Sequence, residues 1–190
     1  SLLNSQPLGF YHPDQLIRDA KDHRVVVLPI DVQVSTFETA LEYQSTMDTK
    51  DSKLFPVRLG LNQIKNISQK KLRKIEMMRG LYAYSSIADL CRRVGLEKKE
   101  VEILGSIGAL RDFDKNRFHA TWSAIGNTKL NGILVTSKII EKSLKKDQLG
   151  IPNSLCKMVF DYNGLGFSSE AHPVSFLRNL IPGKSIIEIK

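Results

Sequence analysis

The stretch Val57–Gly80 decides the fold, and it reads VRLGLNQIKNISQKKLRKIEMMRG. Leu61 and Ile64 are three residues apart and would share one face of a short helix. Residues 65–68 (Lys-Asn-Ile-Ser) form a candidate hairpin, because asparagine tolerates the left-handed backbone that such a turn needs. The sequence therefore predicts two helices joined by a tight hairpin.

The second helix of this pair is marked at its start and along its buried face. Ser68 can accept a hydrogen bond from a backbone N–H and so cap the helix. Leu72, Ile75 and Met78 then recur every three residues, which is the spacing of one apolar stripe on a helix. We expect this helix to run to about Met78.

The rest of this segment is basic, with seven cations against the single acid Glu76. A hairpin before a helix N-terminus points unpaired N–H groups outward, at the positive end of the helix dipole. Such a surface suits a nucleic-acid phosphate, and amides do not read bases, so binding would be independent of sequence. The alternative is an ordinary helical pair with a solvated basic face. The residues expected to contact DNA here are Lys65, Asn66, Ile67, Ser68, Lys70, Lys71, Arg73 and Lys74.

A second arrangement of the same kind is predicted further along the chain. Serines at 85–86 begin a helix that Gly95 ends, because glycine supplies the left-handed residue a C-terminus needs. A helix from about Lys98 follows, then a hairpin at 108–113 and a helix over 115–125. The buried line before the hairpin is Val101, Leu104 and Ile107. The expected phosphate contacts, each with a solvated face as its alternative, are Gly108, Ala109, Arg111, Lys115, Asn116 and Arg117.

The first 56 residues mix helix and strand signals. His12-Pro13-Asp14 opens a helix, because proline fits the first turn and an acid favours the N-terminus. Val25–Leu28 and Leu54–Leu59 are strand candidates, and Pro29 ends the first strand or places it at a sheet edge. Residues 35–38 have capping-box spacing, yet the sequence leaves helix and strand open at this point.

Bulk composition narrows the class of protein. The 190 residues suffice for one large domain or two small ones, and 42% are apolar, which can supply a core. A net charge of +8 favours a polyanionic partner, with a basic protein that has no such partner as the alternative. Two distant cysteines, Cys91 and Cys156, give no disulfide framework, so a cytoplasmic location is expected. The apolar start at Ser1-Leu2-Leu3, without methionine, suggests a piece of a longer protein.

Motifs for catalysis or metal binding are weak. Asp112, Asp114 and Asn116 have the first spacing of a calcium loop, but Arg117 and Ser123 occupy the positions that require glycine and a carboxylate. No carboxylate pair, nucleophile elbow or metal-ligand spacing favours a hydrolase, and no apolar run is long enough for a membrane span. We expect no catalytic residue and no metal site in this chain.

The hairpin segment resembles the first helix-hairpin-helix of the bacterial DNA polymerase III alpha subunit, the C-family of polymerases. The resemblance rests on Arg58-Leu59-Gly60-Leu61 and Lys65-Asn66-Ile67-Ser68, where Ser68 replaces the usual last glycine. Ser106-Ile107-Gly108-Ala109-Leu110 resembles the second motif of that family, and residues 2–11 resemble the end of its fingers region. Asp161-Tyr162 and the His-Pro-x-x-x-Leu-Arg run at 172–178 look closer to the error-prone alpha paralogue.

This resemblance implies a mainly α fold with a small β component (α+β). It divides the chain into the end of the fingers region (1–56), tandem helix-hairpin-helix motifs (57–126) and a linker (127–190) leading to an OB-fold. The parent would be a DNA-directed DNA polymerase that needs Mg²⁺, with catalytic aspartates in a palm domain that this chain lacks. The fragment would hold duplex template–primer DNA through phosphates, and the parent chain would bind a sliding clamp and other subunits. The rival interpretation is a protein-interaction module without DNA contact.

Overall fold

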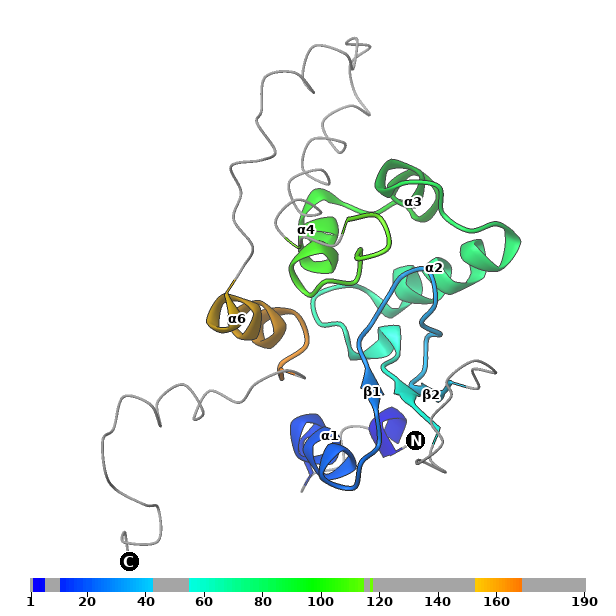
Figure 1. The fold of residues 1–190 in the computed structure, drawn as a ribbon. Helices are drawn as coiled ribbons and strands as arrows, with labels where there is room; N and C mark the ends of the chain where they lie inside the picture. Colours follow the sequence, from blue (N-terminus) through cyan, green and yellow to red (C-terminus); the bar gives the residue numbers. More distant parts are fainter. Residues whose placement is uncertain (1, 6–10, 43–54, 115–116, 118–152, 169–190) are drawn as a thin grey trace, which may run out of the picture.

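The computed structural model describes residues 2–5, 11–42, 55–114, 117 and 153–168. The described part is mainly helical with a small sheet, which confirms the predicted α+β class (Figure 1). In chain order the elements are η1 (Leu2–Ser5), α1 (Pro13–Asp22), β1 (Val27–Leu28), β2 (Ala40–Leu41), β3 (Val57–Arg58), η2 (Leu61–Gln63), α2 (Gln69–Leu81), α3 (Ile87–Val94), α4 (Lys98–Ser106) and α6 (Ser154–Gly164).

The small sheet joins the N-terminal part to the first hairpin. Its strand order is β1-β3-β2, with β1 parallel and β2 antiparallel to β3. Both strand predictions near residues 25–28 and 54–59 are confirmed, and the segment after 35–38 continues as strand β2 rather than as a helix. The domain boundaries predicted at 56/57 and 126/127 stay predictions. Strands β1 and β2 lie before the boundary at 56/57, and both pair with β3, which lies after it.

The helix start and stop signals act locally as the sequence predicts. Proline occupies the first turn of α1, Ser68 Oγ accepts from the amide of Lys71 at 3.4 Å to begin α2, and Ser86 Oγ accepts from Asp89 to begin α3. Gly95 ends α3 with φ of +79°. These are consequences of side-chain capping and of the freedom of glycine, so tertiary context is not needed to predict them.

One predicted element is shorter than expected. The short helix before the first hairpin is the single 3₁₀ turn η2 (Leu61–Gln63), which directly follows the end of strand β3 and Leu59-Gly60. The cause is the close approach of Gly60 to the backbone of residues 37–39, where a Cβ atom would lie 2.4 Å from backbone atoms of Glu38 and Thr39. The main chain is therefore held extended against its neighbour until Leu61.

A single apolar cluster runs through the described helices and the sheet. Leu72 and Ile75 of α2, Leu90 of α3 and Val101 of α4 all belong to it, and all four are buried. Helix α6 lies beside α4 in Figure 1, and Gly164 at its end packs on Ile107, whose Cγ2 atom a Cβ there would approach within 2.3 Å. The sequence analysis did not predict α6. The helix expected over 115–125 lies outside the described residues, apart from Arg117.

Candidate nucleic-acid interface

The first hairpin has the backbone geometry that its sequence predicts. Asn66 adopts φ of +63°, the left-handed conformation, and α2 begins directly after Ser68. Ile67 points inward and is buried, so its side chain belongs to the core. Within the described part of the chain, the amides at positions 69 and 70 have no acceptor, as expected for the first turn of a helix.

One amide of this hairpin is already occupied. The N–H of Lys65 donates to the carbonyl of Gly164 at 2.7 Å, so the end of α6 covers the first residue of the turn. The prediction of outward amides is therefore wrong at Lys65, and the amides without a described acceptor lie at residues 66–70. The ammonium of Lys65 lies over Gly166, in the loop after α6.

Most of the cations in this segment form contacts within the protein. Lys71 binds Glu100 at 2.7 Å and Glu97 at 3.3 Å, and the hydrogen bond to Glu100 raises the pKa of Lys71. Lys74 donates to the carbonyl of Val94 at 3.0 Å. These two lysines therefore join α2 to α3 and α4. Their positive charge and N–H donors are already used within the protein, so less of both is available to a ligand.

Three of the other cations also have partners. Arg58 forms a bidentate pair with Glu42, and Arg79 donates to the carbonyls of residues 32 and 35. Arg73 places its guanidinium carbon 3.8 Å from the centroid of the Phe37 ring. Lys65 and Lys70 are exposed, and neither has an ion pair within the described ranges. The charge available to a polyanion therefore concentrates at the first hairpin and the first turn of α2.

The amides of Gly108 and Ala109 in the second hairpin are already occupied, contrary to the sequence prediction. The N–H of Gly108 donates to Gly105 at 3.0 Å and the N–H of Ala109 donates to Leu104 at 2.9 Å, and both residues are buried. Gly108 has φ of +74°, so the turn is a capped end of α4 in which the amides satisfy helix carbonyls. The carbonyl of Ala109 accepts from Val32, which joins this turn to the N-terminal part.

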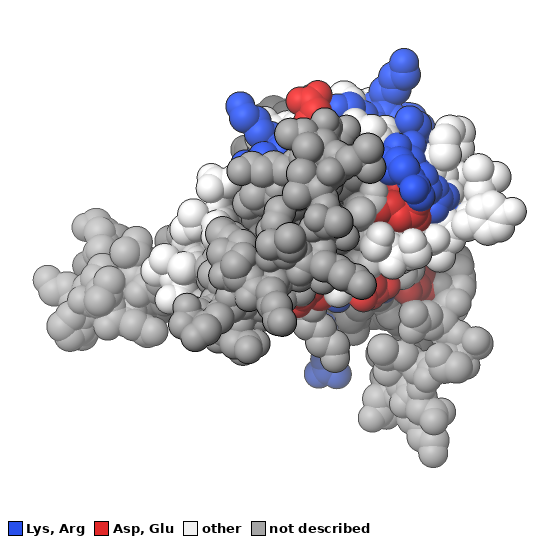
Figure 2. Space-filling model, turned by 90° about the horizontal axis from the view of Figure 1, so that it is seen from above, with Lys and Arg blue, Asp and Glu red and all other residues white. Residues whose placement is uncertain are grey.

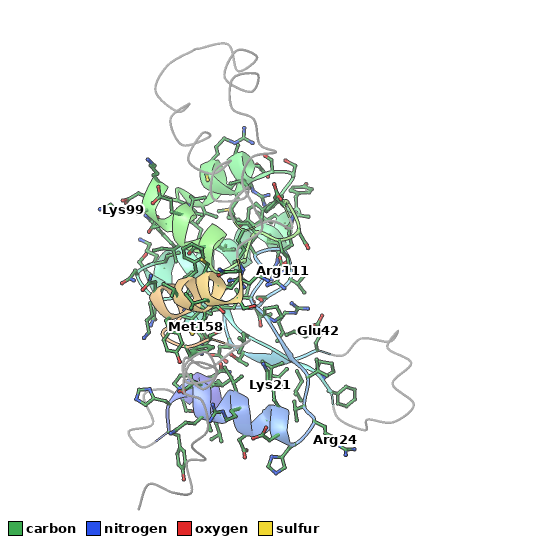
Figure 3. The ribbon with its side chains drawn as sticks, turned by 60° about the vertical axis from the view of Figure 1, so that its left-hand side comes forward. Lys21, Arg24, Glu42, Lys99, Arg111 and Met158 are labelled. Carbon is green, nitrogen blue, oxygen red and sulfur yellow. The ribbon has the colours of Figure 1, made fainter. Side chains whose placement is uncertain are left out.

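The arginines of the second hairpin also point into the protein. Arg111 is labelled near the centre of the molecule in Figure 3. Its Nε lies 3.6 Å from Oδ2 of Asp31, and its Nη2 donates to the carbonyl of Ile30. Burial raises the pKa of the Asp31 carboxyl and lowers the pKa of the Arg111 guanidinium. Arg117 binds Asp161 of α6 at 2.7 Å. Lys115 and Asn116 lie outside the described residues.

The described surface is basic in part but carries both signs of charge. Figure 2 shows Lys and Arg gathered along one edge of the described surface, with Asp and Glu between them. In the described ranges, no three His, Cys, Asp or Glu side chains gather into a possible metal site. None of the described helices is long and apolar enough to cross a bilayer.

The sequence analysis missed the residues that satisfy the second hairpin. Asp31 and Asp161 lie far from that hairpin in sequence, and no local pattern indicates that they pair with its arginines. Helix α6 does have a usable signal: Asn153 Oδ1 accepts from the amide of Cys156 at 2.8 Å, as an N-cap does. An Asn followed by apolar residues at helical spacing is typical of a helix start, so α6 was predictable.

Comparison with known proteins agrees with this geometry. The helix-hairpin-helix motif family matches residues 24–120 of the chain. The error-prone DNA polymerase of Burkholderia pseudomallei is 35% identical over 186 residues, which are 98% of this chain and 17% of that protein. The error-prone DNA polymerases of Teredinibacter turnerae (36% identity, 96% of this chain, 17% of that protein) and Bordetella parapertussis (35%, 94%, 16%) match similarly.

The chain thus spans about a sixth of the length of the curated relatives it matches. The matched family segment contains both hairpins, and the relatives cover nearly all of the chain. The chain therefore belongs to the helix-hairpin-helix family, and almost its whole length is similar to one segment of error-prone DNA polymerases.

Proposed function

We propose that the chain binds duplex DNA without sequence preference, as the phosphate-holding segment of an error-prone, DNA-directed DNA polymerase. The observation that carries the proposal is the first hairpin, where Asn66 turns the chain so that α2 starts with amides that have no described acceptor. Lys65 and Lys70 place two exposed positive charges beside those amides. Amides and lysines recognise phosphate groups and carry no information about base sequence.

The two hairpins would have different tasks. The first offers charge and amides to the DNA backbone, whereas the second binds the chain's own carboxylates, Asp31 and Asp161. The proposed DNA contacts are therefore limited to the backbone of residues 66–70 and the side chains of Lys65, Lys70 and Arg73. Nucleotidyl transfer with Mg²⁺, the sliding clamp and other subunits belong, in this proposal, to the parent polymerase rather than to this segment.

The test is a titration of fluorescent blunt duplex DNA with the 190-residue chain at several salt concentrations. Each phosphate contact contributes about −0.9 to the slope of log affinity against log salt. The double variant Lys65→Ala/Lys70→Ala should reduce that slope by about 2 in magnitude. Two duplexes of equal length and unrelated sequence should bind alike, because the contacts are made to phosphates.

The matched control is Arg24→Asn, which removes a positive charge from an exposed residue near α1, far from Lys99 and the upper helices in Figure 3. Asparagine suits the left-handed backbone of Arg24, whose φ is +63°. This variant should leave the salt slope unchanged. Binding that does not depend on salt, or that Arg24→Asn weakens as much as the double variant does, would contradict the proposal.

A protein-interaction module remains the second candidate, favoured by exposed apolar side chains at the end of α2. Met77 and Leu81 lie four residues apart on one face of that helix, and Tyr82 follows, with 80% of its surface exposed. Exposed apolar residues that gather in this way are typical of a protein contact. If this were the main function, the chain would not be retained on duplex DNA even at low salt.

A further inference from the structure

A cavity opens beside the first hairpin, where segments distant in sequence meet. Its volume is ≈ 410 Å³, which is within the range of ligand sites in proteins. Residues of η1, the start of α1, the turn at 37–38, the connection from η2 into α2, and the loop after α6 all line it. The duplex-binding proposal does not use this cavity, because a duplex is too wide to enter it.

Two cations border the cavity. Lys65 and Arg73 both line it, both are exposed, and neither has an ion pair within the described ranges. One face of the Arg73 guanidinium covers the Phe37 ring at 3.8 Å. The opposite face and the N–H donors of this planar group are then available to a ligand, and a guanidinium plane both stacks on bases and binds phosphate.

The walls of the cavity carry hydrogen-bond acceptors. Gln63 donates through Nε2 to the carbonyl of Leu3 at 3.1 Å and to Asn62 Oδ1 at 3.2 Å, which fixes its amide and leaves Oε1 as an acceptor. The carboxylate of Glu38 lies 3.5 Å from Asn4 Nδ2 and is exposed. An anionic ligand without a neutral part would be repelled by Glu38, so the cavity favours a ligand whose charge is confined to one end.

Apolar surface completes the site. Phe37 and Phe167 line the cavity and are buried, and the Phe37 ring supports the guanidinium plane of Arg73 from behind. Cations at the edge, acceptors on one wall and a guanidinium plane held on a buried ring match the parts of a nucleotide: a phosphate, the donor groups of a base, and the flat base itself. A cavity of this volume admits one such unit.

We propose that this cavity binds a single unpaired nucleotide of a DNA strand held at the first hairpin. Its phosphate lies against Lys65 and Arg73, and its base stacks on the guanidinium of Arg73 and faces Gln63 and Glu38. The inference rests on the proposed function, because the hairpin must first hold the strand. It adds a preference for DNA with a single-stranded end, which phosphate contacts alone would not give.

The experiment compares blunt duplex DNA with a duplex that carries one or two unpaired nucleotides, at the same salt and with the same number of phosphates. The 190-residue chain should bind the DNA with the overhang about fivefold more tightly or better, which is the effect of stacking one base on a protein side chain. Asn62→Trp fills the cavity without changing the charge, and it should remove this preference while it leaves blunt-duplex affinity within about twofold.

Thermal unfolding of Asn62→Trp establishes that the variant is folded. A second measurement needs no variant: a fluorescent adenine analogue at the first unpaired position should change emission on binding, and the same analogue within the duplex should not. Equal affinity for both DNAs would overturn the inference, as would a preference that persists in folded Asn62→Trp.

Two further outcomes separate the inference from the proposal on which it rests. Failure of blunt duplex to bind with salt dependence would overturn the proposed function itself. Binding of free dAMP that Asn62→Trp abolishes, without any preference for overhangs, would assign the cavity to a free nucleotide and overturn its assignment to a DNA strand.

Discussion

Nη1 of Arg117 donates to Oδ1 of Asp161 at 2.7 Å, and the two side chains keep only 12% and 2% of their surface exposed. Arg117 also donates to the carbonyl of Ser106 at 3.2 Å, so it joins the end of α4 to α6. Ser168 Oγ adds a hydrogen bond to the other carboxylate oxygen of Asp161. The second hairpin therefore binds a carboxylate of its own chain at the place where its sequence suggests a phosphate.

Asp161→Asn should destabilise the protein substantially. Removing one partner of a buried ion pair leaves the other charge without compensation, which costs about 3 kcal/mol of unfolding free energy. Urea denaturation measures this change. Glu102→Gln is the matched control, because the Lys98–Glu102 pair is long at 3.8 Å and solvated, and an exposed pair contributes about 1 kcal/mol or less. Equal losses in the two variants would contradict a structural role for the buried pair.

The left-handed residue of the first hairpin leads to a second prediction. Asn66→Val should lower the unfolding free energy by about 1–2 kcal/mol, because a β-branched side chain at φ of +63° meets the following carbonyl. Asn66→Gly is the matched control and should be close to neutral, since glycine adopts this conformation without steric cost. Denaturation midpoints of both variants decide the matter, and a valine variant as stable as the glycine variant would show that the turn adopts another backbone.

The features of this structure that depend on local sequence could be predicted, whereas the contacts between residues far apart in the chain could not. Ser68, Ser86 and Gly95 act within a few residues of themselves, so their roles are readable from the chain alone. The partners of Lys71 and Arg117, in contrast, lie 29 and 44 residues away. A cation that binds a protein carboxylate and one that faces DNA look alike in a sequence, so the candidate site could be predicted only as a region.

The short helix expected before the first hairpin is a 3₁₀ turn rather than an α-helix for the same reason. Leu61 and Ile64 are both buried as their spacing requires, yet they reach the core from a 3₁₀ turn and its end. Spacing of three residues fits either form, and a contact with residues 37–39, more than twenty positions away, decided between them.

The buried thiol of Cys91 predicts a dependence of stability on pH. Burial raises the pKa of Cys91 from 9.0 to about 11, so the folded protein keeps a proton that the unfolded chain loses. The stability contributed by this group is therefore fully present below pH 9.0 and is lost as pH rises toward about 11.

The unfolding free energy of the protein relative to Cys91→Ala should accordingly fall across that interval. Cys156→Ala is the control, because Cys156 is only partly buried in α6 and its removal should leave the pH slope of the wild type in place. A difference between wild type and Cys91→Ala that stays constant across the interval would show that the thiol ionises equally well in both states.

Two glycines near the first hairpin should respond to alanine in opposite directions. At Gly60 a Cβ atom would lie 2.4 Å from backbone atoms of the turn at 38–39, and backbone cannot yield as a flexible side chain can. Gly60→Ala should therefore cost about 1–3 kcal/mol of unfolding free energy and should also weaken DNA binding, because this contact positions the approach to the hairpin.

Gly80→Ala is the matched control: nothing lies within 4 Å of its added Cβ, and alanine in a helix should stabilise α2 by about 0.5–1 kcal/mol. Urea denaturation and duplex titration of the two variants test both effects, and a Gly60→Ala protein that is stable and binds DNA normally would mean that the strand-to-hairpin packing does not set the position of Asn66.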